Sequence, residues 1–248
     1  MAENIFTGRV AEAYDRDSAD MFEPALLDAT ADFLAEEAAG GRALEFGIGT
    51  GRVALPLSRR SVDVHGIDIS ADMIEQLRRK PGAEAITTTI GDIADAVVPG
   101  SFSLVFCVFN VISNLLTQDE QVRCFRNAAR HLRPGGRFVV ELWMPDLRHF
   151  PPGAVAIPFQ VDADHLGFDT LDIATQRGAS HHYYLVGDHV GVIDFPFRYA
   201  WPAELDLMAT IAGMGLHARW ADWDRSPFTS DSVKHISVWT RPNGVAAT

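Results

Sequence analysis

Alternate glycines follow a short apolar segment near the start of the chain. The stretch Glu45-Phe46-Gly47-Ile48-Gly49-Thr50-Gly51 comes after a predicted strand at 42–46 and before a predicted helix at 52–60. Because glycine has no Cβ atom, the chain can turn tightly there and its backbone can lie against a ligand. The spacing G-x-G-x-G differs from the G-x-G-x-x-G that is typical of nicotinamide and flavin sites. The stretch therefore predicts a ligand-binding turn between a strand and a helix.

Strands and helices alternate over residues 42–143. The apolar run at 102–109 is nearly continuous, which is typical of a strand buried on both faces of a parallel sheet. Such alternation implies right-handed βαβ units and an α/β fold with a Rossmann-like, doubly wound sheet. Pro134, Gly135 and Gly136 are expected to close the last helix before the fifth strand begins. The sequence predicts strands at 42–46, 62–67, 85–90, 102–109 and 137–143, and helices at 52–60, 71–80 and 118–132.

The segments outside this core have different patterns. Residues 14–39 have apolar side chains at helical spacing and a break at Pro24, which predicts two N-terminal helices. Residues 150–198 instead contain alternating runs, which predict antiparallel strands inserted after the fifth core strand. The core is expected to finish with a helix at 202–213 and strands at 216–223 and 234–240.

These patterns divide the chain into four segments. An N-terminal helical segment, the Rossmann-like core, a β-rich insertion and the end of the core occupy residues 1–40, 41–145, 146–200 and 201–248. The insertion is interpreted either as a wall of the substrate pocket or as the interface of a homodimer, because both use exposed strands with apolar side chains.

Charge and composition exclude several classes of partner. The formal net charge of −12, from 33 acidic and 21 basic residues, argues against DNA or RNA, which bind basic patches. No segment approaches the roughly 18 continuous apolar residues of a membrane span, and the N-terminus lacks the apolar block of a signal peptide. Cys107 and Cys124 fit no metal or redox spacing and are expected to be buried thiols. We therefore expect a soluble, cytoplasmic protein without nucleic-acid or membrane partners.

Two carboxylates follow the second and third predicted strands. Asp68 comes 17 residues after Gly51, where an acid can accept both hydroxyls of a ribose. It can equally cap the helix that begins near Ser70. Asp92 follows the third strand, where a carboxylate can accept from an adenine amino group or serve as an ordinary turn residue. Since ligands of open α/β sheets bind outside the carboxyl ends of the strands, both acids are candidate nucleoside contacts.

Together, the glycine turn and the two acids resemble the class I S-adenosylmethionine (SAM)-dependent methyltransferases. The turn at 132–137 before the fifth strand is also similar to the family's. The resemblance implies that Glu45 and the glycines hold the methionine part of SAM, that Asp68 holds its ribose, and that Asp92 meets its adenine. Apolar residues beside these acids would line the adenine. The full set assigned to SAM is Tyr14, Glu45, Gly47, Gly49, Gly51, Asp68, Ile69, Met73, Gly91, Asp92, Ile93 and Phe109.

A second resemblance concerns the segments around the core. Residues 10–15, the β-rich insertion and residues 232–235 are similar to bacterial N-methyltransferases that act on nucleotide-linked amino sugars and related natural products. This resemblance implies N-methylation of a nucleotide-linked amino sugar in antibiotic biosynthesis. In those enzymes a His or Tyr after the fourth strand faces the amine, whereas Asn114 stands here, and their basic contact to the diphosphate falls on Lys234. The substrate-binding residues implied are Asn110, Asn114, Trp143 and Lys234.

Methyl transfer makes particular demands on catalytic side chains. The enzyme must hold donor carbon, acceptor atom and leaving sulfur in line. A neutral amine is already nucleophilic, whereas a hydroxyl needs a base or a metal. Asn114 can orient an acceptor but cannot act as a base, which favours an amine. Tyr14, in a helix that can cover SAM, and His182 are the other candidate catalytic residues.

The two adjacent histidines are weighed separately. Because His181 and His182 are neighbours in a predicted strand, they point to opposite faces, and at most one can face a pocket. Neither has recognisable metal-ligand spacing, so no metal site is predicted.

Three other functions remain compatible with the sequence. An O-methyltransferase would share the same architecture. A nicotinamide oxidoreductase would share the fold and the ribose acid, although the glycine spacing argues against it. A non-catalytic module that binds SAM and regulates a partner would show donor binding without turnover.

Overall fold

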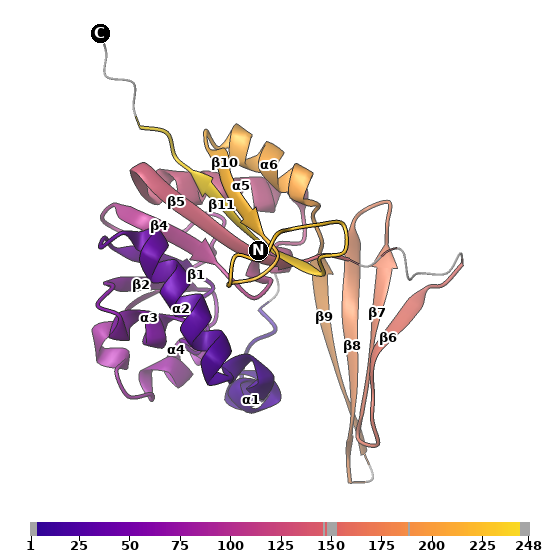
Figure 1. Ribbon diagram of the computed structural model, residues 1–248. Coiled ribbons are helices and arrows are strands. Elements are labelled where there is room, and N and C mark those ends of the chain that lie inside the picture. The colour runs from indigo at the N-terminus through magenta and orange to yellow at the C-terminus, as the bar shows by residue number, and fades with distance from the viewer. Residues whose placement is uncertain (1–3, 146, 148–152, 188, 244–248) are drawn as a thin grey trace.

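The computed structural model describes residues 4–145, 147, 153–187 and 189–243, and a large mixed sheet lies at its centre (Figure 1). Within these residues seven strands form this sheet in the order β10-β11-β5-β4-β1-β2-β3. Strands β1 to β5 are parallel, whereas β11 and β10 are antiparallel additions beside β5. This arrangement confirms the predicted Rossmann-like sheet. The strands are β1 (Ala43–Phe46), β2 (Val64–Asp68), β3 (Thr87–Ile90), β4 (Phe102–Cys107), β5 (Leu132–Trp143), β10 (Gly215–Trp220) and β11 (Lys234–Thr240).

Helices cover both faces of the sheet (Figure 1). On one face, α2, α3 and α4 bury side chains such as Phe33, Leu57 and Ile74. On the other face, α5 and α6 bury Phe125 and Leu205. The helices are α1 (Arg9–Asp17), α2 (Pro24–Ala38), α3 (Ala54–Arg59), α4 (Ala71–Arg78), α5 (Gln118–His131) and α6 (Pro202–Ile211), with short turns η1 (Ala19–Phe22), η2 (Ala83–Ala85) and η3 (Val111–Asn114).

The start of β5 differs from the prediction. Pro134, Gly135 and Gly136 were expected to separate a helix from a strand at 137–143, but they lie inside β5, which begins at Leu132. Gly135 N donates to Arg241 O at 2.8 Å, and Arg241 N donates to Gly136 O at 2.9 Å. The residue that follows β11 therefore pairs with residues 135 and 136, so β5 starts earlier than predicted. This contact joins segments far apart in the sequence.

Two prolines of the N-terminal half lie in the first turns of helices. Pro24 is the first residue of α2, where its fixed φ and missing N–H are tolerated. Pro56 is in the first turn of α3, which begins at Ala54 and not at residue 52. Ser70 caps α4 as predicted, because its Oγ accepts a hydrogen bond from Met73 N at 3.1 Å.

The predicted insertion forms a second, antiparallel sheet after β5. Its described strands are β6 (Ala156–Val161), β7 (His165–Asp172), β8 (Arg177–Val186) and β9 (His189–Arg198), in that order across the sheet. All four lie within the segment 146–200 assigned to the insertion. In Figure 1 this sheet stands beside the core, with β9 nearest to it and β6 outermost.

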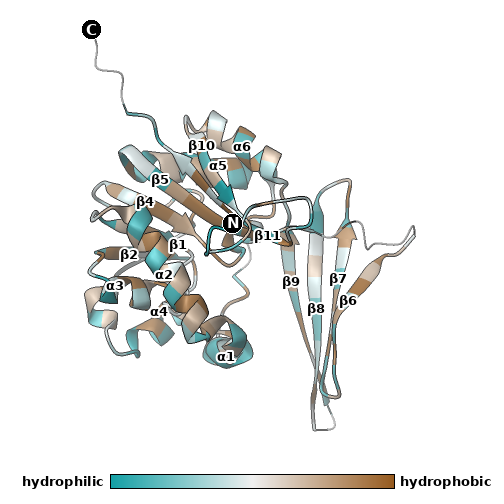
Figure 2. Ribbon diagram, in the orientation of Figure 1, coloured by the Kyte–Doolittle hydropathy of each residue, from teal (hydrophilic) through white to brown (hydrophobic). Residues whose placement is uncertain are grey.

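Hydrophobic residues concentrate in the central strands of the core sheet, whereas the strands of the insertion are mixed (Figure 2). Every residue of β4 is buried, as expected for its apolar run. Both cysteines are buried free thiols, as predicted. None of the helices in the described residues is long and apolar enough to cross a membrane.

Candidate functional site

The glycine turn connects β1 to α3, and its backbone is left-handed at alternate residues. Gly47, Gly49 and Gly51 have φ values of 73°, 54° and 77°, a region that residues with a Cβ rarely adopt. A Cβ at Gly47 would lie 2.5 Å from Val111 Cγ1, and one at Gly51 would lie 2.2 Å from Leu77 Cδ1. Both the backbone conformation and the close packing of the turn therefore require glycine.

Asp68 is the last residue of β2 and binds this turn. Its Oδ2 accepts a hydrogen bond from Gly49 N at 2.7 Å, and its Oδ1 accepts from Ser70 N at 2.8 Å. Burial raises the pKa of the carboxyl, and the bonds from Ser70 and Gly49 oppose this rise. One side chain thus supports the start of α4 and also faces the glycine turn. Its assignment to the ribose of SAM stays a prediction.

A buried carboxylate without a partner lies next to the turn. Glu45, in β1, is 3% exposed, and its Oε2 has no hydrogen-bond partner in the part of the chain that the structure describes. Burial raises the pKa of Glu45 well above its ordinary value, while the Arg52 guanidinium lowers it and Asp68 raises it further. An unpaired buried carboxylate is unfavourable by itself and suits a cationic ligand such as an ammonium group.

Tyr14 of α1 lies in the electrostatic field of the same residues. Burial raises its pKa to about 12, with Arg52 acting against this rise and Asp68 and Glu45 adding to it. The side chains of Tyr14, Glu45, Arg52 and Asp68 are therefore close enough to interact electrostatically. Three of these four residues were assigned to SAM from the sequence. Arg52 is a further member that the sequence reasoning did not assign.

The residues assigned to adenine gather after β2 and β3. Met73 packs close to the glycine turn, since a Cβ added to the middle glycine would lie 3.3 Å from Met73 Cε. Gly91 N donates to the main-chain oxygen of the last β2 residue at 2.8 Å. Asp92 Oδ1 accepts from Ala94 N at 2.8 Å, so one carboxylate oxygen closes a turn. Beside them, Ile69 is half-buried and Ile93 is buried.

The chain after β4 turns at two consecutive non-glycine residues in the left-handed region. Phe109 and Asn110 have φ values of 54° and 60°. Glu141 of β5 holds both, since its Oε2 accepts from Phe109 N at 2.9 Å and its main-chain oxygen accepts from Asn110 N at 3.3 Å. Asn110 Oδ1 accepts from Trp143 N at 2.8 Å, and the Arg52 guanidinium lies 5.0 Å from the centre of the Phe109 ring. Strained backbone of this kind is found mainly at functional sites.

Glu141 is a site residue that the sequence reasoning missed. It is buried, and its Oε1 accepts from Trp223 Nε1 at 3.2 Å and lies 3.5 Å from Lys234 Nζ. Lys234 also lies 2.8 Å from Asp222 Oδ1. The signal available in the sequence was a lone acid in the apolar segment 138–143. Lys234, which was predicted to meet a diphosphate, is therefore engaged by two carboxylates, and its assignment stays a prediction.

The other substrate-side residues surround this turn. Asn114 is the exposed last residue of η3, and Val111, the first residue of η3, packs against the glycine turn. Trp143 ends β5, and its ring meets that of Phe197 in β9 edge to face at 5.5 Å. Asn110 and Trp143 are thus brought together by a hydrogen bond, whereas Asn114 has no side-chain hydrogen bond with them.

The adjacent histidines of the insertion point to opposite faces, as predicted. His181 Nδ1 lies 2.7 Å from Asp194 Oδ1 on one face. On the other face, His182 Nδ1 lies 3.0 Å from His165 Nε2 and 3.3 Å from Tyr184 Oη. Burial lowers the pKa of His182, and His165 lowers it further, so this imidazole is neutral at pH 7. Among the described residues, no group of three or more His, Cys, Asp or Glu side chains could hold a metal.

The face of the insertion that carries His182 is turned toward the N-terminal segment. The ring of Phe195, on the same face of β9, lies 5.3 Å from the ring of His182 and 5.9 Å from that of Phe6. The ring of Phe6 lies 6.0 Å from that of Tyr14, and its carbonyl accepts a hydrogen bond from Ser70 Oγ. A line of aromatic rings therefore connects the insertion to the helix that carries Tyr14.

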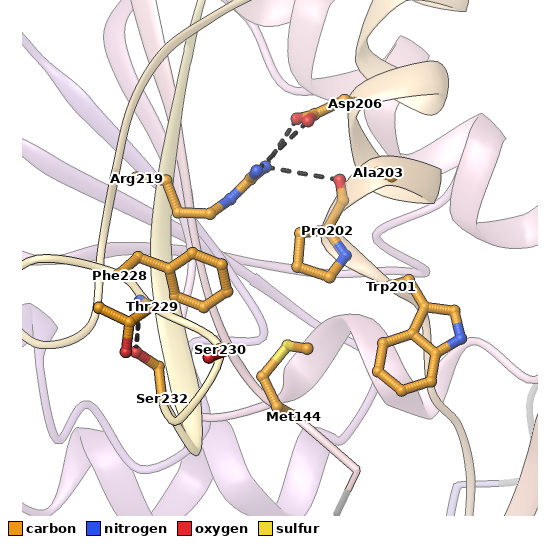
Figure 3. A pocket seen from close by; sticks show the side chains of 10 residues that line it. All are labelled: Met144, Trp201, Pro202, Ala203, Asp206, Arg219, Phe228, Thr229, Ser230 and Ser232. Carbon is orange, nitrogen blue, oxygen red and sulfur yellow. Dashed lines mark hydrogen bonds and ion pairs between the residues drawn. The ribbon is translucent and has the colours of Figure 1, made fainter. Parts of the chain in front are cut away.

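A cavity of about 540 Å³ lies beyond the end of β5, between α6 and the segment 227–233 that leads into β11 (Figure 3). Its apolar walls are formed by Met144, Trp201 and Phe228, and the hydroxyl groups of Thr229 and Ser230 line one side. The sequence reasoning assigned none of these residues to a site.

Comparison with known proteins identifies the family. Residues 43–136 match the model of a methyltransferase domain. The chain is 30% identical, over 75% of its length and 74% of the relative's, to the dTDP-3-amino-3,6-dideoxy-alpha-D-glucopyranose N,N-dimethyltransferase of Streptomyces fradiae. The chain belongs to the SAM-dependent methyltransferases. SAM as the cofactor and methyl transfer as the reaction, both predicted from the glycine turn and the two acids, are thereby confirmed.

Two further relatives of this methyltransferase are similar along most of their length. The CcbJ methyltransferase from Streptomyces caelestis is 35% identical, with a TM-score of 0.85 over 94% of this chain and 96% of that structure. The cypemycin N-terminal methyltransferase of a Streptomyces species is 26% identical over 82% of this chain and 84% of the relative. The similarity therefore extends beyond the SAM-binding core into the insertion and the last strands.

Proposed function

We propose that this methyltransferase transfers the methyl group of SAM to the amino nitrogen of a nucleotide-linked amino sugar in natural-product biosynthesis. The observation that carries the proposal is the similarity, over three quarters of the chain, to an enzyme whose name specifies N,N-dimethylation of a dTDP-linked amino sugar. The β-rich insertion is consistent with this acceptor, whereas Asn114 at the end of η3 departs from the His or Tyr of the amino-sugar enzymes.

The donor side is formed by residues of the first three strands. We propose that the unpartnered carboxylate of Glu45 holds the ammonium group of SAM, that Asp68 accepts from its ribose hydroxyls, and that Asp92 accepts from its adenine. When bound, SAM supplies a methyl group whose bonding electron pair stays on the sulfur, while the acceptor nitrogen loses one proton. Tyr14 has a pKa of about 12, which keeps its hydroxyl protonated. This hydroxyl can donate a hydrogen bond to a bound ligand, and the side chain can shield the site from water.

The acceptor side offers amide groups, which suit an amine. Asn110 is held by Trp143 N, and Asn114 is exposed at the end of η3. An amide oxygen can accept a hydrogen bond from an amine and so aim its lone pair. It cannot remove a proton from a hydroxyl, whose pKa lies far above 7. We propose that His182, neutral at pH 7, receives the proton that the nitrogen loses.

The test offers the enzyme SAM with a matched pair of dTDP-linked sugars, one bearing an amine and the other a hydroxyl at the same carbon. We expect one or two methyl groups to be added, and fragmentation in the mass spectrometer to place them on the nitrogen. Methylation of oxygen alone would favour the O-methyltransferase interpretation. Binding of SAM, measured by calorimetry, without turnover of either sugar would favour a non-catalytic module or a different acceptor.

A further inference from the structure

The cavity beyond β5 has walls that are already held in place. The ring of Phe228 lies 5.9 Å from the Arg219 guanidinium and meets the ring of His235 edge to face at 5.9 Å. The ring of Trp201 packs edge to face with that of Tyr199 at 5.9 Å, yet the residue is 36% exposed. In Figure 3 the Phe228 and Trp201 rings stand on opposite sides of the cavity. Rings fixed in this way can bind a flat ligand at little cost in ordering.

The charged groups of the cavity are engaged within the protein. Arg219 donates to the two carboxylate oxygens of Asp206 at 2.7 and 3.3 Å, and to Ser237 Oγ at 2.8 Å. Asp206 Oδ1 also accepts from Trp239 Nε1 at 2.9 Å. A phosphate site needs available donors, usually those of Arg or Lys. Since the donors of Arg219 are taken, the cavity suits an uncharged group better than a phosphate.

The cavity also adjoins the acceptor side of the site. Met144, in its wall, directly follows Trp143, whose N–H is bonded to Asn110. Met144 N donates to Val233 O at 2.7 Å, which fixes the wall against the segment leading into β11. The cavity thus lies at the same end of β5 as the turn after β4, and an acceptor whose amine lies at that turn would have to extend past the end of β5 to reach it.

We propose that the cavity binds an uncharged, flat ring that the acceptor carries at a distance from its amine. The rings of Trp201 and Phe228 contact its faces, and the hydroxyl groups of Thr229 and Ser230 bond to its polar edge. The ring can be the base of a nucleotide-linked sugar or an aromatic group attached directly to the sugar. A volume of about 540 Å³ lies in the usual range for small-molecule sites, roughly 300–1,000 Å³. This inference rests on the proposed function, because the amino sugar supplies the amine.

The test uses acceptors that differ only in the ring. The amino sugar named for the Streptomyces fradiae relative is prepared as its methyl glycoside, its phenyl glycoside and its dTDP ester. Wild type is compared with Trp201→Ala, Trp201→Phe and Phe228→Ala, and with Leu207→Ala as a control, because Leu207 is an exposed residue of α6 outside the cavity wall. Calorimetry in the presence of S-adenosylhomocysteine measures binding, and mass spectrometry of the product measures KM.

We expect Trp201→Ala and Phe228→Ala to weaken binding of the acceptor whose ring reaches the cavity, either the phenyl glycoside or the dTDP ester, about fivefold to tenfold, since one aromatic contact contributes about that factor. The methyl glycoside should be unaffected, and Trp201→Phe and Leu207→Ala should bind like wild type or nearly so. A loss for the dTDP ester alone would identify the ring as the base, and a loss for the phenyl glycoside alone would identify it as an aromatic group attached directly to the sugar.

Unchanged binding of both the phenyl glycoside and the dTDP ester in the alanine variants, or an equal loss for the methyl glycoside, would overturn the inference. Binding of the phenyl glycoside that depends on Trp201, but without methylation of any of the three compounds, would instead count against the proposed function and leave the cavity assignment standing. Melting temperatures of all variants show whether a loss comes from unfolding.

Discussion

Glu45, which we propose to bind SAM, is expected to reduce the stability of the unliganded protein. Burial raises its pKa in the folded chain, so the folded chain keeps a proton that the unfolded chain loses above the ordinary glutamate pKa of about 4.3. The free energy of unfolding therefore falls as pH rises from that value toward the raised pKa. We expect Glu45→Gln to be more stable than wild type at neutral pH, by about 1–3 kcal/mol, and equally stable near pH 4.3 or below. Thermal unfolding across this pH range measures the difference.

The same variant should bind SAM more weakly, because an amide cannot neutralise an ammonium group. A gain in stability together with a loss of SAM affinity of about tenfold or more is the expected pair of results. Glu36→Gln is the control, because Glu36 is an exposed acid of α2 that pairs with Arg225. If Glu45→Gln bound SAM as tightly as wild type, Glu45 would not contact the ammonium.

Asp68 has both a structural and a proposed binding role, and two substitutions separate them. Asp68→Ala should weaken SAM binding by about 2 kcal/mol or more, roughly 30-fold, through loss of the acceptor for the ribose hydroxyls. It should also lower the melting temperature, because Gly49 N and Ser70 N lose their acceptor. Asp68→Asn keeps one acceptor oxygen, so its melting temperature should stay closer to that of wild type while the affinity still falls. Unchanged affinity for S-adenosylhomocysteine in both variants would contradict the ribose assignment.

At the scale of single elements, the turn after β4 depends on a strand that follows it in the chain. Glu141→Ala would leave the Phe109 N–H without its acceptor, which should cost about 1–3 kcal/mol of stability and lower kcat by about tenfold or more as the turn relaxes. Glu141→Gln keeps an acceptor for Phe109 and should retain more activity. Trp223→Phe removes the indole donor to Glu141 and part of a buried ring, but keeps the acceptor of Phe109 N; it is the control for a loss of packing beside Glu141. Wild-type kcat in Glu141→Ala would show that the strained turn does not position the reacting groups.

The insertion offers a matched pair of histidines on one strand. If His182 receives the proton, His182→Ala should lower kcat by about tenfold or more, at the modest end for acid–base catalysis, and should remove the acidic limb of the pH–rate profile. His181→Ala should leave kcat nearly unchanged, because His181 faces the other side and contacts Asp194. His165→Ala should shift the acidic limb to higher pH, since His165 helps to lower the pKa of His182. Equal activities of the His181 and His182 variants would exclude this role.

Features coded by neighbouring residues could be read from the sequence. The glycine turn, Asp68 at the end of β2 and the Ser70 cap depend on contacts within one βα unit, and each was predicted. Glu141 could not be assigned, because its role requires β5 to lie beside β4 and beside β11, which brings Lys234 opposite Trp143. The early start of β5 likewise depends on Arg241. Sequence reasoning therefore reached the glycine turn and the residues next to it, whereas the turn after β4 is held by long-range strand pairing.

At the scale of the whole molecule, the insertion is connected to the core through a small number of described contacts. Phe195 meets Phe6, Phe197 meets Trp143, and Arg198 donates into the core. The face that carries His182 thus lies against the N-terminal segment and the end of β5, which supports the interpretation of the insertion as a wall of the pocket. A homodimer through its opposite face stays a prediction, which light scattering of the purified protein can test.

Arg198 is a buried polar link between the insertion and helices α5 and α6 of the core, and its removal should weaken the whole molecule. It lies at the end of β9, is 5% exposed, and donates to Gln121 Oε1 of α5 at 2.6 Å and to Glu204 Oε1 of α6 at 2.7 Å. Arg198→Ala leaves the largely buried carboxylate of Glu204 without its cation, which should cost about 3 kcal/mol in urea unfolding. Arg198→Lys keeps the positive charge but cannot donate to two partners as the guanidinium does, so its stability should lie between those of wild type and Arg198→Ala.

The control for this substitution is Arg177→Ala. Arg177 pairs directly with Arg198 in the β8–β9 register and is exposed, so its loss should change stability by less than about 0.5 kcal/mol. If the insertion owes its position to Arg198, limited proteolysis should also cut within 153–187 faster in Arg198→Ala than in Arg177→Ala, and the KM for the acceptor should rise while the affinity for SAM is retained. Equal stability and equal cleavage of the two variants would show that the insertion is held against the core without the Arg198 side chain.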